Sequence, residues 1–193
     1  MNLKNWLTAT AVVALTGCGP MIVQSPGEGL SPVNAVSEGD EDHLMLFGHD
    51  VVNYFTKGTH AKGSPEHRLE HKGVSFWFAS AEHQAMFAQN PDKFTPMYGG
   101  YCANGIAYAI PWGGNVDNFQ IIDEKLYIFG GLQSMEAFLL DTEGNLALAD
   151  KYWSEEVADS NAFFQRTQRL IFKVPHYKSG AELAEMIAAS KAQ

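Results

Sequence analysis

Residues 98–105, YGGYCANG, place a single cysteine, Cys102, among glycines and small side chains. A cysteine thiolate is a soft ligand for copper or zinc, and it is also a redox-active nucleophile. Gly99 and Gly100 would let the backbone approach a bound ion closely, because glycine adopts conformations that other residues avoid. The alternative is a small, inert cysteine buried at a sharp turn. The residues themselves leave both interpretations open.

His83 is the second residue whose type could serve such a site. It lies four residues before Phe87 in a segment with helical spacing, so we expect its imidazole to point inward. Most histidines in that position are hydrogen-bonded core residues, but an imidazole also binds copper and zinc readily. Met97 is a further soft side chain near Cys102, and it suits either Cu(I) or packing.

Other chemistries lack a motif in this chain. The sequence contains no GxSxG, P-loop, dinucleotide-binding fingerprint, CxxC or CxxCH pattern. No organic cofactor is therefore indicated.

The N-terminus has the layout of an export signal. Lys4 precedes an apolar stretch over residues 6–15 that is too short to span a bilayer, which needs about 20 apolar residues. Residues 15–18, Leu-Thr-Gly-Cys, resemble the bacterial lipobox, whose cysteine is lipidated. This resemblance implies that Cys18 carries the lipid and that the protein is attached to the cell envelope. Because Gly19 follows in place of Asp, it also implies the outer membrane, with the chain facing the periplasm.

The predicted lipidation of Cys18 leaves Cys102 without a partner in the chain. Disulfides are the usual fate of thiols in an oxidising compartment, so burial or occupation of Cys102 is favoured.

Composition supports a folded, acidic domain. Of the 193 residues, 46% are hydrophobic, and the formal net charge is −9. Neither nucleic acid nor an anionic membrane surface is then expected as the main partner, since both require clustered Lys and Arg. The membrane contact that we expect is the N-terminal lipid.

Segment patterns predict an α+β fold of small antiparallel hairpins and short helices, with a C-terminal helical extension. We expect one hairpin around Lys72-Gly73 and another in residues 119–131, with a longer or bulged turn because Glu124 disfavours a tight primed turn. Between them, Ser80 caps a helix over 81–89 and Pro91 starts a short one. Helices are also expected over 134–141, 145–153 and 161–172, and after a capping box of Ser179 and Glu182.

The segment FWFASAEHQAMFAQNPDKFTPMYGGYCANG resembles the YHS domain family, in the exported branch with a single cysteine. The likeness extends from GHDVVNYF to Trp153. It implies a YHS-like domain over 43–155. The export signal gives a signal peptide over 1–18, composition gives a Gly-, Pro- and Ser-rich linker over 19–42, and the helical patterns give the extension over 156–193.

The resemblance also implies a ligand set. Metal-binding members carry Phe-Cys-Ser-x-x-Cys where this chain has Phe78-Ala79-Ser80-Ala81-Glu82-His83, so one thiol is absent and His83 stands at the second cysteine. Cys102, with Asp50 and Tyr54 from the first motif, would complete the site. Asp50 is a ligand, a base, or a brace that caps the Cys102 loop by accepting backbone N–H groups. Tyr54 is expected to be mainly core.

These residues lead to three hypotheses. The first is a lipid-anchored, periplasm-facing module that holds copper, or else zinc, through Cys102 with His83 or Asp50, for trafficking or sensing and not for turnover. The second is a redox enzyme whose Cys102 thiol is activated by His83. The third is a structural or interaction domain in which the motif is core; no protein partner is indicated.

Overall fold

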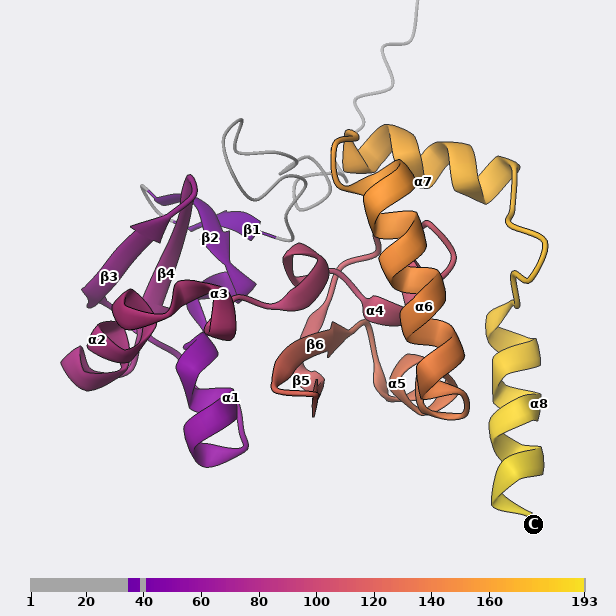
Figure 1. Cartoon of the computed structure of the whole chain (residues 1–193), viewed down its shortest axis with the longest axis horizontal. Helices are drawn as coiled ribbons and strands as arrows, with labels where there is room; N and C mark the ends of the chain where they lie inside the picture. The colour runs from indigo at the N-terminus through magenta and orange to yellow at the C-terminus, as the bar shows by residue number, and fades with distance from the viewer. Residues whose placement is uncertain (1–34, 39–40, 193) are drawn as a thin grey trace, which may run out of the picture.

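The computed structural model describes residues 35–38 and 41–192 of the chain (Figure 1). Its architecture is α+β, as the sequence predicts. Residues 1–34, with the predicted signal segment and Cys18, lie outside the described part. Among the described residues the first strand starts at Ala35, inside the range expected as linker and before His43, where the sequence suggested that ordered structure starts.

The N-terminal half is a four-stranded sheet with helices packed on it. Its strands are β1 (Ala35–Glu38), β2 (Glu41–Met45), β3 (Ser64–His71) and β4 (Val74–Phe78), in the order β1-β2-β4-β3. The pairs β1–β2 and β3–β4 are antiparallel, and β2 pairs with β4 in parallel. The helices are α1 (Val51–Lys57), α2 (Ala81–Gln89) and α3 (Pro91–Phe94). Figure 1 shows this half on the left.

The elements predicted around the first hairpin are confirmed. His71 pairs with Val74, so the chain turns at Lys72-Gly73, where both residues have positive φ. Ser80 caps α2 by accepting a hydrogen bond from the backbone N–H of His83. Pro91 begins α3 at a position where a helix needs no N–H donor.

The second hairpin exists, but its predicted turn was wrong. Strands β5 (Asn115–Ile122) and β6 (Lys125–Phe129) are antiparallel, and Ile122 pairs with Lys125. Only Asp123 and Glu124 form the turn, with φ values of 48° and 60°. A tight primed turn therefore forms despite Glu124, because the pairing of the flanking strands outweighs the cost of its positive φ.

Strand β6 lies between two hydrophobic cores. Leu126 and Ile128 pack with α1, α2 and the first sheet, while Tyr127 and Phe129 pack on the opposite side, as alternation along a strand requires. We call the first set the N-terminal core: Met45, Leu46, Val51, Val52, Tyr54, Val74, Phe76, Phe78, Phe87, Phe94, Leu126 and Ile128. The C-terminal core contains, among others, Tyr98, Cys102, Ile106, Phe129, Phe138 and Tyr152.

The C-terminal half is helical. It contains α4 (Ala103–Ile106), α5 (Leu132–Leu139), α6 (Thr142–Tyr152), α7 (Ala162–Ile171) and α8 (Gly180–Lys191). The predicted capping box of Ser179 and Glu182 opens α8, which packs on α5. Within residues 35–38 and 41–192, no helix has both the length and the apolar character needed to cross a membrane.

Candidate functional site

Asp50 is held at the start of α1. Its Oδ1 accepts the backbone N–H groups of Val52 at 2.8 Å and Asn53 at 3.3 Å, as an N-cap does. Gly58 ends the helix in the left-handed conformation. No helix was predicted over residues 51–57, although Asp50 before them and Gly58 after them are the residue types that begin and end helices.

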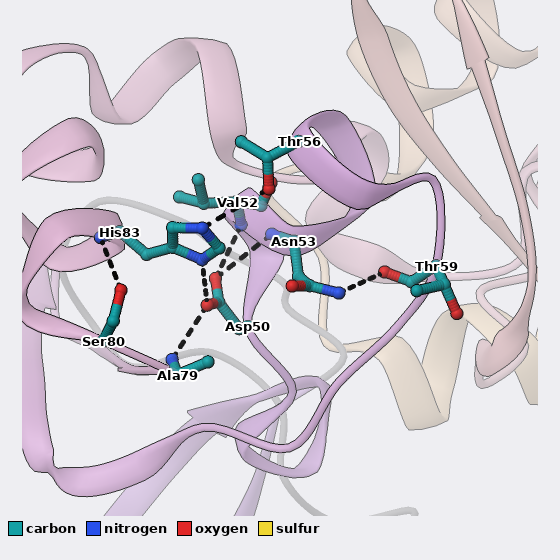
Figure 2. Close-up of polar contacts among 8 residues, drawn as sticks. All are labelled: Asp50, Val52, Asn53, Thr56, Thr59, Ala79, Ser80 and His83. Carbon is teal, nitrogen blue, oxygen red and sulfur yellow. Dashed lines mark hydrogen bonds and ion pairs between the residues drawn. The ribbon is translucent and has the colours of Figure 1, made fainter.

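The other oxygen of Asp50 joins α1 to β4 and α2. Oδ2 accepts the backbone N–H of Ala79 at 2.8 Å and lies 2.6 Å from Nδ1 of His83 (Figure 2). The carboxyl group is buried, with 0% exposure. Asp50 thus accepts backbone N–H groups as one interpretation expected, but it braces the junction of α1, β4 and α2 and not the Cys102 loop.

His83 points inward, as the sequence predicts. Its Nδ1 faces a buried carboxylate, which favours the tautomer that carries the proton on Nδ1 and leaves the lone pair on Nε2. Nε2 lies 3.4 Å from Oγ1 of Thr56, whose single hydroxyl proton is donated to the carbonyl of Val52 at 3.2 Å. In Figure 2 the imidazole of His83 lies between the carboxylate of Asp50 and the hydroxyl of Thr56. The contact of the His83 ring to Thr56 is longer than its 2.6 Å contact to Asp50.

Thr56 connects this chain of contacts to a pocket. The pocket has a volume of about 370 Å³ and opens between α1, α2, α3 and the β5–β6 turn. Its lining residues are Phe55, Thr56, Met86, Lys93, Phe94, Ile121 and Glu124. Met86 is three residues after His83 on α2, so both side chains lie on one side of that helix.

Tyr54 is a core residue. Its ring meets Phe119 edge to face at 4.6 Å, and its hydroxyl donates to the carbonyl of Val116 at 3.2 Å. Burial raises the pKa of Tyr54, and the charges of Asp117 and Asp50 raise it further. The hydroxyl therefore keeps its proton and donates it to a carbonyl of β5. A protonated hydroxyl with this bond is poorly suited to be a metal ligand.

Cys102 lies in the C-terminal core, away from the Asp50–His83 pair. It is 3% exposed, and its Sγ lies 3.1 Å from Oγ of Ser134 at the start of α5. Its backbone bridges to Ile128 of β6. The left-handed turn before it is formed by Tyr98, Gly99 and Gly100, all with positive φ. The burial favoured for this thiol is confirmed, whereas the Ser134 contact had no signal in the sequence.

The structure thus brings together two of the expected site residues, Asp50 and His83. Within the described part of the chain, no three His, Cys, Asp or Glu side chains form a group that could hold a metal ion. What the arrangement offers chemically is one imidazole nitrogen, oriented by a buried carboxylate, beside a hydroxyl at a pocket wall.

Comparison with known proteins found no family model, no curated protein and no solved structure that matches the chain.

Proposed function

We propose that this chain is a lipid-anchored module of the bacterial cell envelope that faces the periplasm and holds a soft metal ion, copper in preference to zinc, at His83. The resemblance of the sequence to exported YHS domains and to the lipobox motivates this proposal. The observation that supports the site is the 2.6 Å contact between Asp50 Oδ2 and His83 Nδ1. A carboxylate on one ring nitrogen orients the imidazole and raises the basicity of the other nitrogen, which is how metal-binding histidines are commonly supported.

The second donor in this proposal is the thioether of Met86. A thioether and an imidazole together favour Cu(I) over harder ions, because soft ligands select soft metals. Both side chains belong to α2, and Met86 lines the pocket through which an ion would enter. The ion would displace the hydroxyl of Thr56, whose contact with Nε2 is long at 3.4 Å.

This proposal moves the metal from Cys102 to His83. The Cys102 thiol is buried against Ser134 in the C-terminal core, so it does not belong to the donor set of His83. Asp50 supports the site without binding the ion, since both of its oxygens already accept two hydrogen bonds each.

A competition titration of the purified full chain with Cu(I) and a coloured chelator tests the proposal. We expect one copper per chain, loss of binding in His83→Ala, and binding weakened by about 10- to 100-fold in Asp50→Asn. Met86→Leu should weaken binding and Thr56→Ala should preserve it. His67→Ala on β3 is the matched histidine control, and it should bind as the parent chain does.

Two results would overturn the proposal. One is the absence of any copper or zinc uptake by the folded chain. The other is metal binding that survives His83→Ala and disappears in Cys102→Ser, which would restore Cys102 as the ligand.

A second candidate function is hydrolysis, because the carboxylate of Asp50, the imidazole of His83 and the hydroxyl of Thr56 contact one another in sequence. In this arrangement the Thr56 hydroxyl would turn its proton from the carbonyl of Val52 to His83 Nε2, which would accept it while Asp50 holds the ring, as in acyl-transfer enzymes. The supporting observation is the 3.4 Å contact at the wall of the pocket. Turnover of a p-nitrophenyl ester that is lost in Thr56→Val would favour this enzyme, and its absence would exclude hydrolysis of such esters.

A further inference from the structure

Helix α7 presents its apolar face to solvent. Its spacing predicts one apolar face, and such a face normally packs on the core. Instead, Phe164 is 70% exposed, Ile171 is 68% exposed, and Phe172 just after the helix is 67% exposed. Leu170 is also among the exposed large hydrophobic residues. We call these four residues the α7 apolar face.

Specific hydrogen bonds fix this orientation of α7. The buried side of the helix is polar: Gln165 donates to the carbonyl of Ala109 at 3.1 Å, and Nη2 of Arg166 donates to the carbonyl of Pro111 at 2.6 Å. Arg169 pairs with Glu156. A rotation of the helix that brought the α7 apolar face inward would break these bonds and leave buried polar groups unsatisfied. The outward position of the apolar face is therefore built into the fold.

The charge of this segment is opposite to that of the rest of the chain. Residues 160–181 contain no acidic residue, whereas the whole chain has a formal net charge of −9. Arg166 is buried and Arg169 is paired with Glu156, so the exposed basic side chains of this segment are Lys173 and Lys178. An apolar stripe rich in Phe and flanked by basic residues is the composition of a helix that lies in the interface of an anionic bilayer. Two copies of this face packed together would instead bring like charges close to one another.

The position of α7 suits contact with the bilayer that the proposed anchor would enter. Ala35 follows Cys18 by 17 residues, and a chain of that length spans at most about 60 Å. In Figure 1, α7 runs along the upper edge of the right half, and β1 lies in the upper part of the left half.

We propose that the α7 apolar face docks on the anionic lipid surface of the membrane that holds Cys18. This inference rests on the proposed lipid anchor and is independent of the metal site. The face inserts Phe164, Ile171 and Phe172 among the acyl chains near the headgroups. Docking would hold the folded domain in one orientation against the bilayer.

The test is a spin-label measurement on the lipidated full chain, reconstituted in vesicles of phosphatidylethanolamine and phosphatidylglycerol. The label is placed at Phe164→Cys, with Ala88→Cys on the exposed side of α2 as the matched control; the buried Cys102 stays unlabelled. We expect the label at 164 to collide with oxygen and to be shielded from a water-soluble nickel chelate. The label at 88 should show the reverse, and circular dichroism should show that both variants are folded.

Three results would overturn the inference. A label at 164 that stays open to the nickel chelate, in a chain whose mass shows lipid at Cys18, would refute docking while the anchor stands. Dipolar broadening between labels at 164 would identify a second copy as the occupant. A mass without lipid at Cys18 would remove the anchor, and with it this inference, while the copper titration would still decide the metal site.

Discussion

Asp50 is the residue on which the candidate site depends. It accepts four hydrogen bonds, from α1, from the end of β4 and from His83, although it is fully buried. One side chain therefore caps a helix, joins three elements and orients the imidazole. Stability and metal binding should both decline when this carboxylate is changed.

Asp50→Asn tests that dependence. The amide replaces one accepting oxygen by a donor, which leaves buried N–H groups facing it, so we expect the free energy of unfolding to fall by about 2–4 kcal/mol. Urea unfolding measures this change. The matched control is Asp141→Asn at the exposed N-cap of α6, where Asn and Asp cap equally well and the change should stay within about 0.5 kcal/mol. Equal effects at the two positions would contradict the role of Asp50.

Buried tyrosines give the protein a predictable response to alkali. Burial raises the pKa of Tyr54, Tyr98 and Tyr101 above their ordinary value of about 10. The folded chain then keeps protons that the unfolded chain releases, so stability is complete below about pH 10 and is lost as the pH rises further. The urea concentration at the unfolding midpoint should therefore be lower at about pH 11 than at about pH 8, and this decrease should be smaller in Tyr54→Phe. Tyrosinate absorbance that grows for all three residues while circular dichroism stays native would refute this.

At the level of elements, local signals in the sequence predicted what is local in the structure. Ser80, Pro91 and the box of Ser179 and Glu182 begin helices where their cap chemistry places them. The contact between Cys102 and Ser134 joins residues 32 apart in the chain, and no cap or period encodes it. The separation of Cys102 from His83 is equally nonlocal, because it depends on β6 packing between the two cores.

The β5–β6 turn shows where tertiary pairing outweighs local preference. Glu124 has a φ of 60°, which costs a residue with a side chain about 1–2 kcal/mol. Glu124→Gly should therefore raise the free energy of unfolding by about 1 kcal/mol, measured by urea unfolding. The control, Glu82→Gly in the first turn of α2, should lower it by about 0.5–1 kcal/mol. Destabilisation by Glu124→Gly would show that the turn is not strained.

Considered as a whole, the molecule is two cores that share one strand. Leu126 and Ile128 belong to the N-terminal core, and Tyr127 and Phe129 to the C-terminal core. The side chains of β6 alternate between the two cores. If β6 detaches, both cores therefore lose buried side chains at the same time. We expect the described part of the chain to unfold as one unit.

Ile128→Ala tests this coupling. Removal of a fully buried Ile should cost about 2–5 kcal/mol. The indole NMR signals of Trp77 in the first sheet and of Trp153 beside the C-terminal core should then disappear at the same, lower urea concentration. Ile121→Ala, at a position 38% exposed, should cost about 1 kcal/mol or less. Two separate transitions would contradict the shared strand.

The most direct test of the central claim is an NMR spectrum of the histidine side-chain nitrogens during titration of the full chain with Cu(I). The account predicts that one imidazole Nε2 signal shifts strongly, that it belongs to His83 because it is absent from His83→Ala, and that the Cys102 β-carbon does not move. An unmoved His83 Nε2, together with a shifted Cys102 β-carbon, would contradict it.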